Sequence, residues 1–390
     1  MRFPEFTDEW KESVLSDFVE RVKRKNKNNL CKLPLTISAQ YGLVDQISFF
    51  NKVIASENMS NYYLLHKGDF AYNKSYSSEY PWGAIKRLDC YEQGTLSSLY
   101  ICFKPYSHVS SDFLTHYFET SKWHQGISEI AVEGARNHGL LNVGIQDFFE
   151  TRHCLPQSLL EQEKIAKFLN LIEERIATQN KIIEKLQSLI KGLIDDIITL
   201  KCGQLVAFET LYSKAGEGGT PTTSNTEFYD NGSIPFIKID DLSNKYLSAN
   251  KDYITELGLK KSSAWLIPTH SIIYSNGATI GAISINKYPV CTKQGILGIV
   301  PNTNIDVEFL YYFMQSSYFQ KEVERVVTEG TMKTAYLKDI NHIKCPIPDL
   351  DRQKEISHFL SVLSLKEDVE RQLLQKYQIQ KQYLLRKMFI

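Results

Sequence analysis

The sequence predicts an α+β fold in which two similar β-rich blocks are each followed by one long helix, as a tandem repeat with pseudo-two-fold character. Three observations predict it. The octapeptide QEKIAKFL at 162–169 returns as QKEISHFL at 353–360, each copy opens a segment with heptad-spaced apolar residues, and strand-like runs precede both segments. Sequence motifs that recur in the same order along a chain indicate a duplicated structural unit.

The segment from Leu159 to Leu200 is predicted to form the first long helix. It contains no proline, and its apolar residues step alternately by four and three positions, interrupted only by Gln179. This seam consists of Ile165, Leu169, Ile172, Ile176, Ile183, Leu186, Ile190, Leu193 and Ile197. A 3.5-residue spacing kept over about five heptads is typical of a coiled coil, in which each apolar side chain meets a partner helix.

The segment from about Leu350 to Ile390 is predicted to form the second helix. Its matching seam consists of Ile356, Leu360, Leu363, Leu374, Tyr377 and Leu384. Charged residues interrupt this seam at Glu367, Glu370 and Lys381, and a locally shifted seam of Leu365, Val369 and Leu373 is a second possibility. Each helix has about 40 residues and is therefore roughly 60 Å long.

The two blocks have the texture of β-structure and share marks in the same order. Runs such as LYICF, IPFIKI and SIIYSN lie between Gly, Asn, Ser and Pro residues, as strands do. GDFAYN (68–73) corresponds to HSIIYSN (270–276), Gly-Ala-Ile occurs at 83–85 and 281–283, Gln-Gly at 93–94 and 294–295, and DFLTHYF (112–118) matches EFLYYFM (308–314). We therefore predict four segments: block 1–155, helix 156–201, block 202–347 and helix 348–390.

Composition and charge exclude several classes of protein. Lys and Arg together number 45, as do Asp and Glu, so the net charge of zero argues against a simple polycationic nucleic-acid binder. The basic run RVKRKNKNNLCK, at 21–32, is a local exception. No apolar run has the roughly 20 residues of a membrane span, and the N-terminal stretch lacks the apolar region of a signal peptide. A cytoplasmic location is therefore expected, with no membrane partner.

Motifs of catalysis and metal binding are missing from the sequence. KAGEGGTPTT is not followed by the Gly-Lys-Ser/Thr of a phosphate loop, and the histidines and seven cysteines show no metal-ligand spacing. Asp349 and Asp351 are explained as first-turn carboxylates that cap the second helix. The Asn-Pro-Pro-aromatic motif used for adenine methylation is also missing. The chain is therefore predicted to have no catalytic residue, and to bind no metal.

A duplicated body with two rods suits a target that has two halves. Duplex DNA repeats a face of its major groove about every 34 Å, so a rod pair of about 60 Å can set the spacing of two half-sites. Reading bases requires polar side chains on exposed loops. The candidates in the first block are Asn73, Lys74, Ser75, Tyr76, Lys86, Arg87, Arg136 and Asn137; those in the second are Ser275, Asn276, Lys293, Gln294, Thr331 and Lys333.

Several stretches carry a resemblance to a known family. GEGGTPTTSNTEFYDNGSIPFIKIDDL (216–242), SAQYGLVDQISFF (38–50) and NYYLLHKGDFAYNKSYSSEYPWGAIKR (61–87) resemble target-recognition domains, and the Leu-Pro and Ile-Pro openings of the two helices resemble helical regions of the same family. The chain as a whole resembles the specificity subunit of type I restriction-modification enzymes. The more polar second seam and the divergence of the two blocks are its departures from the pattern.

The resemblance implies more than the residues alone do. Each block would read one part of a split DNA site, and the two helices would pack antiparallel and measure the unread spacer. The helices would also bind two modification subunits, which use S-adenosylmethionine to methylate adenine. Two restriction subunits, which use ATP and Mg²⁺, would join them. This chain would itself bind no cofactor.

Two rival functions remain open at the level of the sequence. The first is a coiled-coil scaffold whose two blocks bind protein or carbohydrate and have no role with DNA. The second is an independent nuclease or methyltransferase, which would be active as a purified single chain with magnesium or S-adenosylmethionine.

Overall fold

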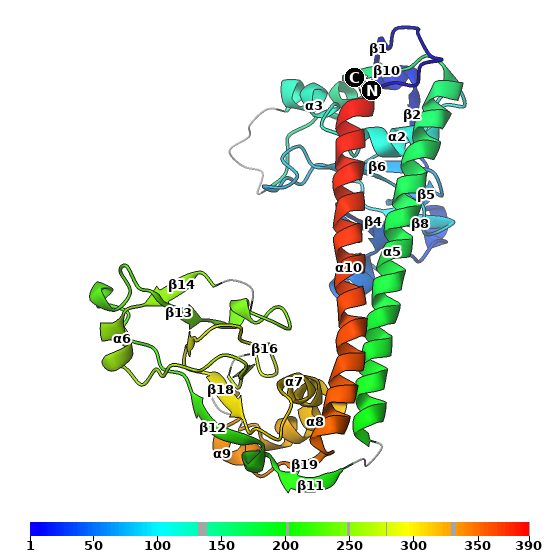
Figure 1. Ribbon diagram of the computed structural model, residues 1–390. Helices are drawn as coiled ribbons and strands as arrows, with labels where there is room; N and C mark the ends of the chain where they lie inside the picture. Colours follow the sequence, from blue (N-terminus) through cyan, green and yellow to red (C-terminus); the bar gives the residue numbers. More distant parts are fainter. Residues whose placement is uncertain (132–138, 200–202, 248–249, 278, 329–332, 390) are drawn as a thin grey trace. The chain divides into compact units, whose positions relative to one another are not determined.

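Figure 1 shows the computed structural model, which describes residues 1–131, 139–199, 203–247, 250–277, 279–328 and 333–389. The chain divides into two compact units: unit 1 comprises Met1–Gln179 and Leu373–Ile390, and unit 2 comprises Asn180–Gln372. Each unit therefore combines one β-rich block with part of both long helices. The predicted four-segment division follows the order of the chain, whereas these units follow its packing, and the four segments stay a prediction.

Unit 1 is built on a four-stranded antiparallel sheet in the order β2-β9-β6-β7. These strands are β2 (Val19–Arg21), β9 (Ile101–Pro105), β6 (Phe70–Asn73) and β7 (Ala84–Arg87). Three antiparallel pairs surround the sheet: β1 (Lys11–Val14) with β10 (Arg152–Leu155), β3 (Leu35–Ser38) with β4 (Gly42–Asp45), and β5 (Tyr63–His66) with β8 (Gln93–Leu96). The short helices are α1 (Gln46–Phe50), α2 (Ser111–Tyr117), α3 (His124–Ile130) and α4 (Ile145–Phe149).

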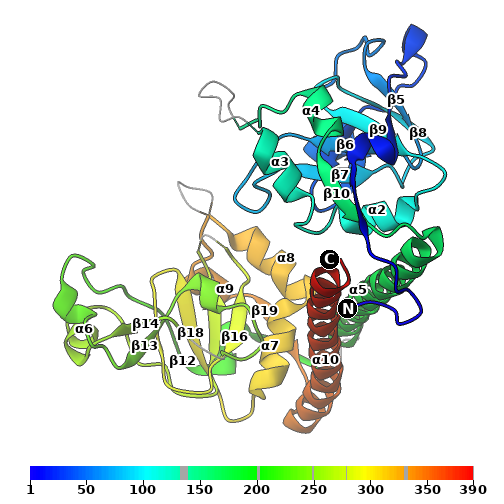
Figure 2. The ribbon, with the colours of Figure 1, turned by 90° about the horizontal axis from the view of Figure 1, so that it is seen from above.

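Both faces of the unit 1 sheet are covered. Because side chains alternate along a strand, Phe70 and Tyr72 of β6 point to one face and Ala71 to the other. Phe70 and Tyr72 join Phe103 in a buried cluster with residues of α2, α3 and α4, while Ala71 packs with Leu65 of β5 in a second cluster. Figure 2 shows α3 and α4 on one side of this sheet and β5 and β8 on the other.

Unit 2 repeats this sheet with the same strand order, β12-β18-β15-β16. These strands are β12 (Tyr212–Glu217), β18 (Ile296–Pro301), β15 (Ile272–Ser275) and β16 (Ile283–Ile285). A second sheet holds β14 (Asp252–Ile254), β13 (Ile234–Ile237) and β17 (Cys291–Thr292), and β11 (Gln204–Ala207) pairs with β19 (Lys344–Ile347). The short helices are α6 (Glu256–Lys260), α7 (Val307–Gln315), α8 (Ser317–Val326) and α9 (Leu337–Ile340).

Strand register confirms most of the predicted correspondence between the blocks. Tyr72 lies opposite Ile85 in unit 1, and Tyr274 lies opposite Ile283 in unit 2, so the two Gly-Ala-Ile stretches are equivalent. Their glycines both have positive φ, 78° and 101°, and a Cβ on Gly83 would lie 2.1 Å from the Asn73 carbonyl oxygen. Only glycine adopts this conformation without strain.

One predicted correspondence is wrong. Gln93 and Gly94 lie inside strand β8, whereas Gln294 and Gly295 precede strand β18 and are not in a strand. Since β18 is the equivalent of β9 in the sheet order, the two Gln-Gly pairs fall at different places in the fold. A dipeptide match was too short to distinguish these positions.

The two long helices are α5 (Leu159–Thr199) and α10 (Leu350–Met388), which pack antiparallel as the resemblance implied (Figure 1). In unit 1, Ile165, Leu169 and Ile172 are buried in the same cluster as Leu384. In unit 2, Ile190 is buried in one cluster with Ile356 and Leu360. Of the remaining seam residues, Ile183 is buried, and Ile176, Leu186, Leu193, Ile197, Leu363, Leu374 and Tyr377 are half-buried.

The second seam continues in register through its charged residues. Leu365 is 64% exposed and Val369 is 52% exposed, so the alternative shifted seam is wrong. Glu367 and Lys381 instead lie on the inner face and are half-buried. Gln187 Nε2 of α5 donates to Glu367 Oε1 at 2.9 Å in unit 2, and Lys381 pairs with Glu173 of α5 at 2.6 Å in unit 1. Polar partners on α5 therefore stabilise charges that the heptad pattern alone treated as breaks.

The repeated glutamines of the two octapeptides form equivalent hydrogen bonds in the two units. Gln162 Oε1 accepts the N–H of Ser110 at 2.8 Å, and its Nε2 donates to the Pro156 carbonyl at 2.8 Å. Gln353 Oε1 accepts the N–H of Asp306 at 2.9 Å, and its Nε2 donates to the Pro348 carbonyl at 2.9 Å. Ser110 and Asp306 are the N-caps of α2 and α7. Each buried amide thus joins a long helix to the equivalent short helix of its block.

We expect Gln162→Ala and Gln353→Ala each to lower the free energy of unfolding by about 1.5 kcal/mol, because each leaves a backbone N–H and a backbone carbonyl that are at least partly buried without this partner. The first change should destabilise unit 1 and the second unit 2. Urea denaturation monitored together with amide hydrogen exchange would measure both. Gln378→Ala, at an exposed position of α10, is the control and should leave stability unchanged. Loss of stability in only one unit would contradict the equivalence.

No helix in the described part of the chain is both long enough and apolar enough to cross a membrane.

Candidate nucleic-acid interface

In unit 1 the end of strand β6 and the loop that follows it contain four residues predicted to contact DNA: Asn73, Lys74, Ser75 and Tyr76. Asn73 Oδ1 accepts the N–H of Ser75 at 3.0 Å, which fixes the start of the loop. The Leu141 N–H donates to the Lys74 carbonyl at 2.9 Å, and the Tyr76 N–H donates to the Gly139 carbonyl at 3.1 Å. Ser75 and Tyr76 are exposed, and Lys74 is half-buried. The loop 73–76 is therefore bound to the segment that directly follows the predicted Arg136 and Asn137, which lie outside the described residues.

In unit 2 three segments meet at the equivalent strand end. The Asn276 N–H donates to the Gly295 carbonyl at 3.1 Å, and the Ala335 N–H donates to the Asn276 carbonyl at 2.9 Å. These bonds bring Lys293, Gln294 and Lys333, all exposed, to the neighbourhood of one loop. The predicted Thr331 lies outside the described residues.

The backbone pairing is the same in both units. Lys74 and Asn276 are equivalent positions, because Phe70 pairs with Phe103 as Ile272 pairs with Ile299. Each accepts a backbone N–H from the segment before the last short helix of its block, Leu141 in unit 1 and Ala335 in unit 2. The fold therefore presents loops of different sequence at one equivalent place.

Ser275 and Asn276 are a correction to the prediction, which placed them on exposed loops. Ser275 is 0% exposed and Asn276 is 1% exposed, because the first ends strand β15 inside the sheet and the second lies between the 295 and 335 segments. Asn276 Nδ2 donates to the Ala335 carbonyl at 3.1 Å. Contact between either side chain and a base would require the covering segments to move.

Lys86 and Arg87 do not lie on the loop 73–76, and both form ion pairs with acidic side chains. Lys86 forms an ion pair with Glu119, and Arg87 pairs with Asp89 at 2.7 Å and with Asp112 at 2.6 Å. Arg87 also donates to Ser111 Oγ at 3.0 Å, so it links β7 to the start of α2. Their positive charges are thus largely compensated within the block.

The basic run at 21–32 forms a separate cationic surface beside strand β2. A hollow of about 330 Å³ there is lined by Glu20, Arg21, Val22, Lys23, Arg24 and Lys104. Arg24 pairs with Asp69, and Lys25 lies 3.7 Å from the centre of the Tyr63 ring. Lys23 is exposed and has no ion-pair partner among the described residues. The contribution of Lys104, on the neighbouring strand β9, was missed because it depends on the pairing of β2 with β9.

No group of three or more His, Cys, Asp or Glu residues that could hold a metal ion occurs in the described part of the chain.

The chain is similar in sequence to specificity subunits of type I restriction enzymes. Residues 212–377 match the family model "Type I restriction modification DNA specificity domain". The chain is 27% identical over 210 residues to the EcoR124I/EcoR124II specificity subunit of Escherichia coli, covering 52% of each chain. It is 24% identical over 317 residues to the MjaVIII specificity subunit of Methanocaldococcus jannaschii, covering 74% of this chain and 72% of the relative.

The match in length varies among the relatives. The chain spans about half of the Escherichia coli relative and 34% of the MjaIX specificity subunit of Methanocaldococcus jannaschii, to which it is 32% identical over 150 residues.

Solved structures share the fold over almost the whole chain. A chain from a structural study of complex assembly and conformational transition of the type I restriction-modification system superposes with a TM-score of 0.62 at 15% identity, covering 98% of this chain and 97% of that one. The S subunit of the type I restriction-modification system from M. genitalium superposes with a TM-score of 0.54 at 14% identity, covering 100% and 99%. Residues 212–377 belong to the family of type I restriction-modification DNA specificity domains, and the chain as a whole has the fold of the solved S subunit.

Proposed function

We propose that this chain selects the DNA sequence on which a type I restriction-modification complex acts, and that each block reads one half of a bipartite duplex site. The observation that carries the proposal is the repeated sheet with different loops at the same strand end. Unit 1 presents Ser75 and Tyr76 there, and unit 2 presents Lys293 and Gln294. Side chains of these types donate to and accept from base edges and phosphates, so two diverged loops suit two different half-sites.

The helix pair would set the spacing of the half-sites and bind two modification subunits. Three leucines of α5 are largely exposed: Leu160 at 71%, Leu171 at 49% and Leu189 at 50%. Steps of 11 and 18 residues return to nearly the same side of an α-helix, so these leucines share one outer face. An exposed apolar stripe of this kind suits a protein partner.

The cofactors of the assembled enzyme would reside in its other subunits. S-adenosylmethionine would be bound by the modification subunits, and ATP and Mg²⁺ by two restriction subunits, with this chain binding none of them. The complex would act on DNA in the cytoplasm. Partner subunits would also supply much of the phosphate neutralisation, which is consistent with the zero net charge of this chain.

An exchange of block 1 between this chain and a related specificity subunit tests the proposal. Residues 1–155 would be replaced together with residues 384–389, because Leu384, Met388 and Phe389 pack against that block. Adenine methylation would then be mapped in cells that also express the modification subunit. We expect one half-site to change and the other to stay. An unchanged methylated sequence would instead favour the scaffold function, and activity of the purified chain alone would favour an independent enzyme.

We expect Lys74→Ala and Lys293→Ala to weaken DNA binding by the assembled complex, each lowering the slope of log affinity against log salt by about 1 if the lysine contacts a phosphate. Titration of the complex with a duplex that contains the mapped methylation site, at several salt concentrations, measures this slope. Lys191→Ala, at an exposed position of α5, is the matched control. Wild-type affinity and slope in both loop variants would remove these lysines from the interface.

A further inference from the structure

We propose that each recognition block is fastened to the helix pair by a polar latch at one equivalent place, and that the latches position the blocks so that the complex accepts a single spacer length. This inference rests on the proposed function. The second latch consists of Lys245, Tyr246, Glu308, Tyr312 and Ser361; the first consists of His116, Asn170, Glu173 and Lys381.

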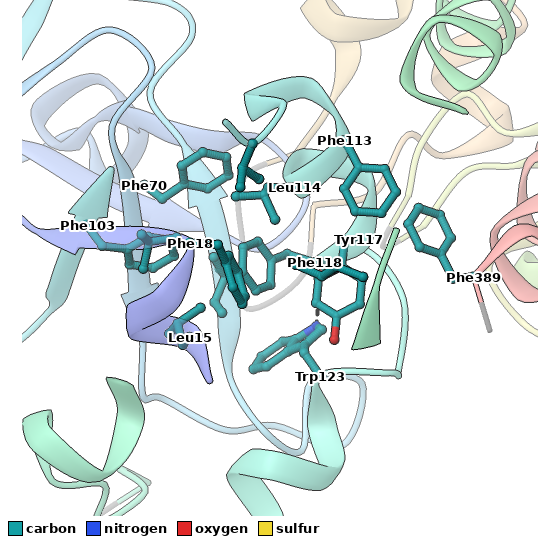
Figure 3. Packing of buried hydrophobic residues seen from close by; sticks show 14 of the residues in the cluster. Leu15, Phe18, Phe70, Phe103, Phe113, Leu114, Tyr117, Phe118, Trp123 and Phe389 are labelled. Carbon is teal, nitrogen blue, oxygen red and sulfur yellow. Dashed lines mark hydrogen bonds between the residues drawn. The ribbon is translucent and has the colours of Figure 1, made fainter. Parts of the chain in front are cut away.

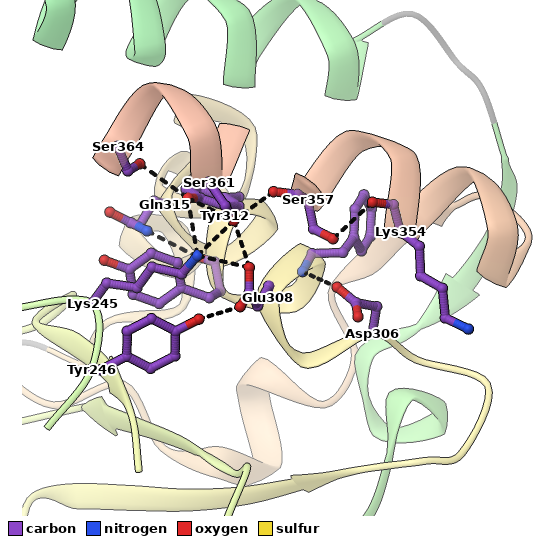
Figure 4. Close-up of polar contacts among 12 residues, drawn as sticks. Lys245, Tyr246, Asp306, Glu308, Tyr312, Gln315, Lys354, Ser357, Ser361 and Ser364 are labelled. Carbon is purple, nitrogen blue, oxygen red and sulfur yellow. Dashed lines mark hydrogen bonds and ion pairs between the residues drawn. The ribbon is translucent and has the colours of Figure 1, made fainter. Parts of the chain in front are cut away.

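The second latch joins three separate parts of unit 2 (Figure 4). Lys245 Nζ lies 2.8 Å from Glu308 Oε2, 2.8 Å from Ser361 Oγ and 3.2 Å from Tyr312 OH. Tyr246 OH and Ser361 Oγ donate to the two oxygens of Glu308. Lys245 and Tyr246 come from the block, Glu308 and Tyr312 from α7, and Ser361 from α10. One carboxylate thus holds a loop, a short helix and a long helix together.

The latch is partly buried, and its positive and negative charges are paired with each other. The Lys245 side chain is 15% exposed and that of Glu308 is 30% exposed. Burial acts to raise the pKa of Glu308, but hydrogen bonds from Lys245, Ser361 and Tyr246 outweigh it and hold this pKa below its usual value. Burial and the neighbouring Glu308 raise the pKa of Tyr246. Charge-assisted hydrogen bonds of this kind are roughly twice as strong as neutral ones, and breaking one leaves a buried charge.

Two residues of the first latch, His116 and Asn170, occupy positions equivalent to Tyr312 and Ser361 of the second latch. The N-caps Ser110 and Asp306 align α2 with α7, which places His116 where Tyr312 lies. The octapeptide repeat likewise places Asn170 and Glu173 of α5 where Ser361 and Ser364 of α10 lie. His116 Nε2 is 2.6 Å from Asn170 Oδ1 and Nδ1 is 3.7 Å from Glu173 Oε1, and Tyr312 OH is 3.0 Å from Ser364 Oγ.

The shared position, rather than shared chemistry, indicates a common role. The same residue of an equivalent short helix reaches the same two positions of a long helix in both units, yet the side chains are different. Glu173 is in turn paired with Lys381 of α10, so the first latch contacts both long helices. Neither latch includes the exposed loop residues Tyr76, Lys293 and Gln294. A latch can therefore set how a block sits on the helices without contacting bases.

Glu308→Gln tests the role of the second latch, because it keeps the shape of the side chain but removes its charge. Cells expressing the full chain with its modification subunit would be mapped for methylated adenine. We expect the half-site bases to stay the same, while modification of sites whose spacer differs by one base pair rises by roughly tenfold, the effect of losing one charge-assisted hydrogen bond. The charge-reversed pair Lys245→Glu with Glu308→Lys should restore part of the spacer preference.

The controls separate this inference from the proposed function and from a loss of folding. Glu322→Gln removes an acid from the exposed ion pair with Arg325 on α8 and should leave the spacer unchanged. If Glu308→Gln prevents folding, Ser361→Ala, which removes one bond of the latch, gives the same test. A wild-type spacer preference in a folded latch variant overturns the latch. Methylation that does not depend on this chain at all would instead overturn the proposed function.

Discussion

Phe389→Ala is expected to lower the free energy of unfolding of unit 1 by about 4 kcal/mol, as is typical when a fully buried phenylalanine is truncated. Phe389 directly follows Met388, the last residue of α10, and it is 2% exposed. Its ring centre lies 5.3 Å from that of Phe113 and 5.9 Å from that of Tyr117, both on α2 (Figure 3). It lies 6.4 Å from the ring centre of Trp10. The end of α10 thus completes the core of the block that begins the chain.

Tryptophan fluorescence during urea denaturation measures this effect well. Three of the four tryptophans, Trp10, Trp82 and Trp123, lie in unit 1, so the signal reports mainly on that unit. Leu365→Ala is the matched control: Leu365 is a large apolar residue of α10, but it is mostly exposed. A cost below about 1 kcal/mol for Phe389→Ala would mean that Phe389 is not part of the core.

The helices were the most predictable part of the fold, because a heptad is a local pattern that one segment contains in full. The burial of Phe389 was not predictable, since it depends on where α2 and Trp10 lie in three dimensions. The inner-face position of Glu367 and Lys381 was missed for the same reason: their partners, Gln187 and Glu173, are on the other helix. A sequence shows which residues are polar but not which polar residues meet.

The positions of the candidate loops in the fold were predictable, and the exposure of their residues was less so. Equivalent strand ends place the 73–76 and 275–277 loops at one position of the fold, as the repeat indicated. Whether a residue on such a loop is exposed depends on the segments that cross it, and these bury Asn276 while leaving Gln294 open. Arg87 likewise forms an ion pair with Asp112 of α2, and the sequence around Arg87 does not indicate this pairing.

His153 is a buried residue that the sequence did not single out and that is held in its neutral form. Its Nδ1 lies 2.9 Å from Tyr117 OH, and its Nε2 lies 2.8 Å from Thr151 Oγ1. Because Thr151 donates its only hydroxyl hydrogen to the Phe148 carbonyl, Nε2 carries the ring proton and Nδ1 accepts from Tyr117. A second proton on Nδ1 would face a donor, and burial lowers the pKa of His153 from 6.5 to about 4.

Unit 1 is therefore expected to lose about 2 kcal/mol of stability between pH 7 and pH 5 through His153. The unfolded chain binds this proton near pH 6.5 and the folded chain only near pH 4, so stability falls as the pH drops through that window. His116, whose pKa burial also lowers, adds to the loss in the same direction. Urea denaturation of wild type and His153→Gln at pH 7, 6 and 5 isolates the contribution of His153, because only the wild type should show it. His358→Gln, at an exposed position of α10, should follow the wild type. If His153→Gln also follows the wild type, the folded chain binds this proton as readily as the unfolded chain, and the proton assignment to Nε2 alone is wrong.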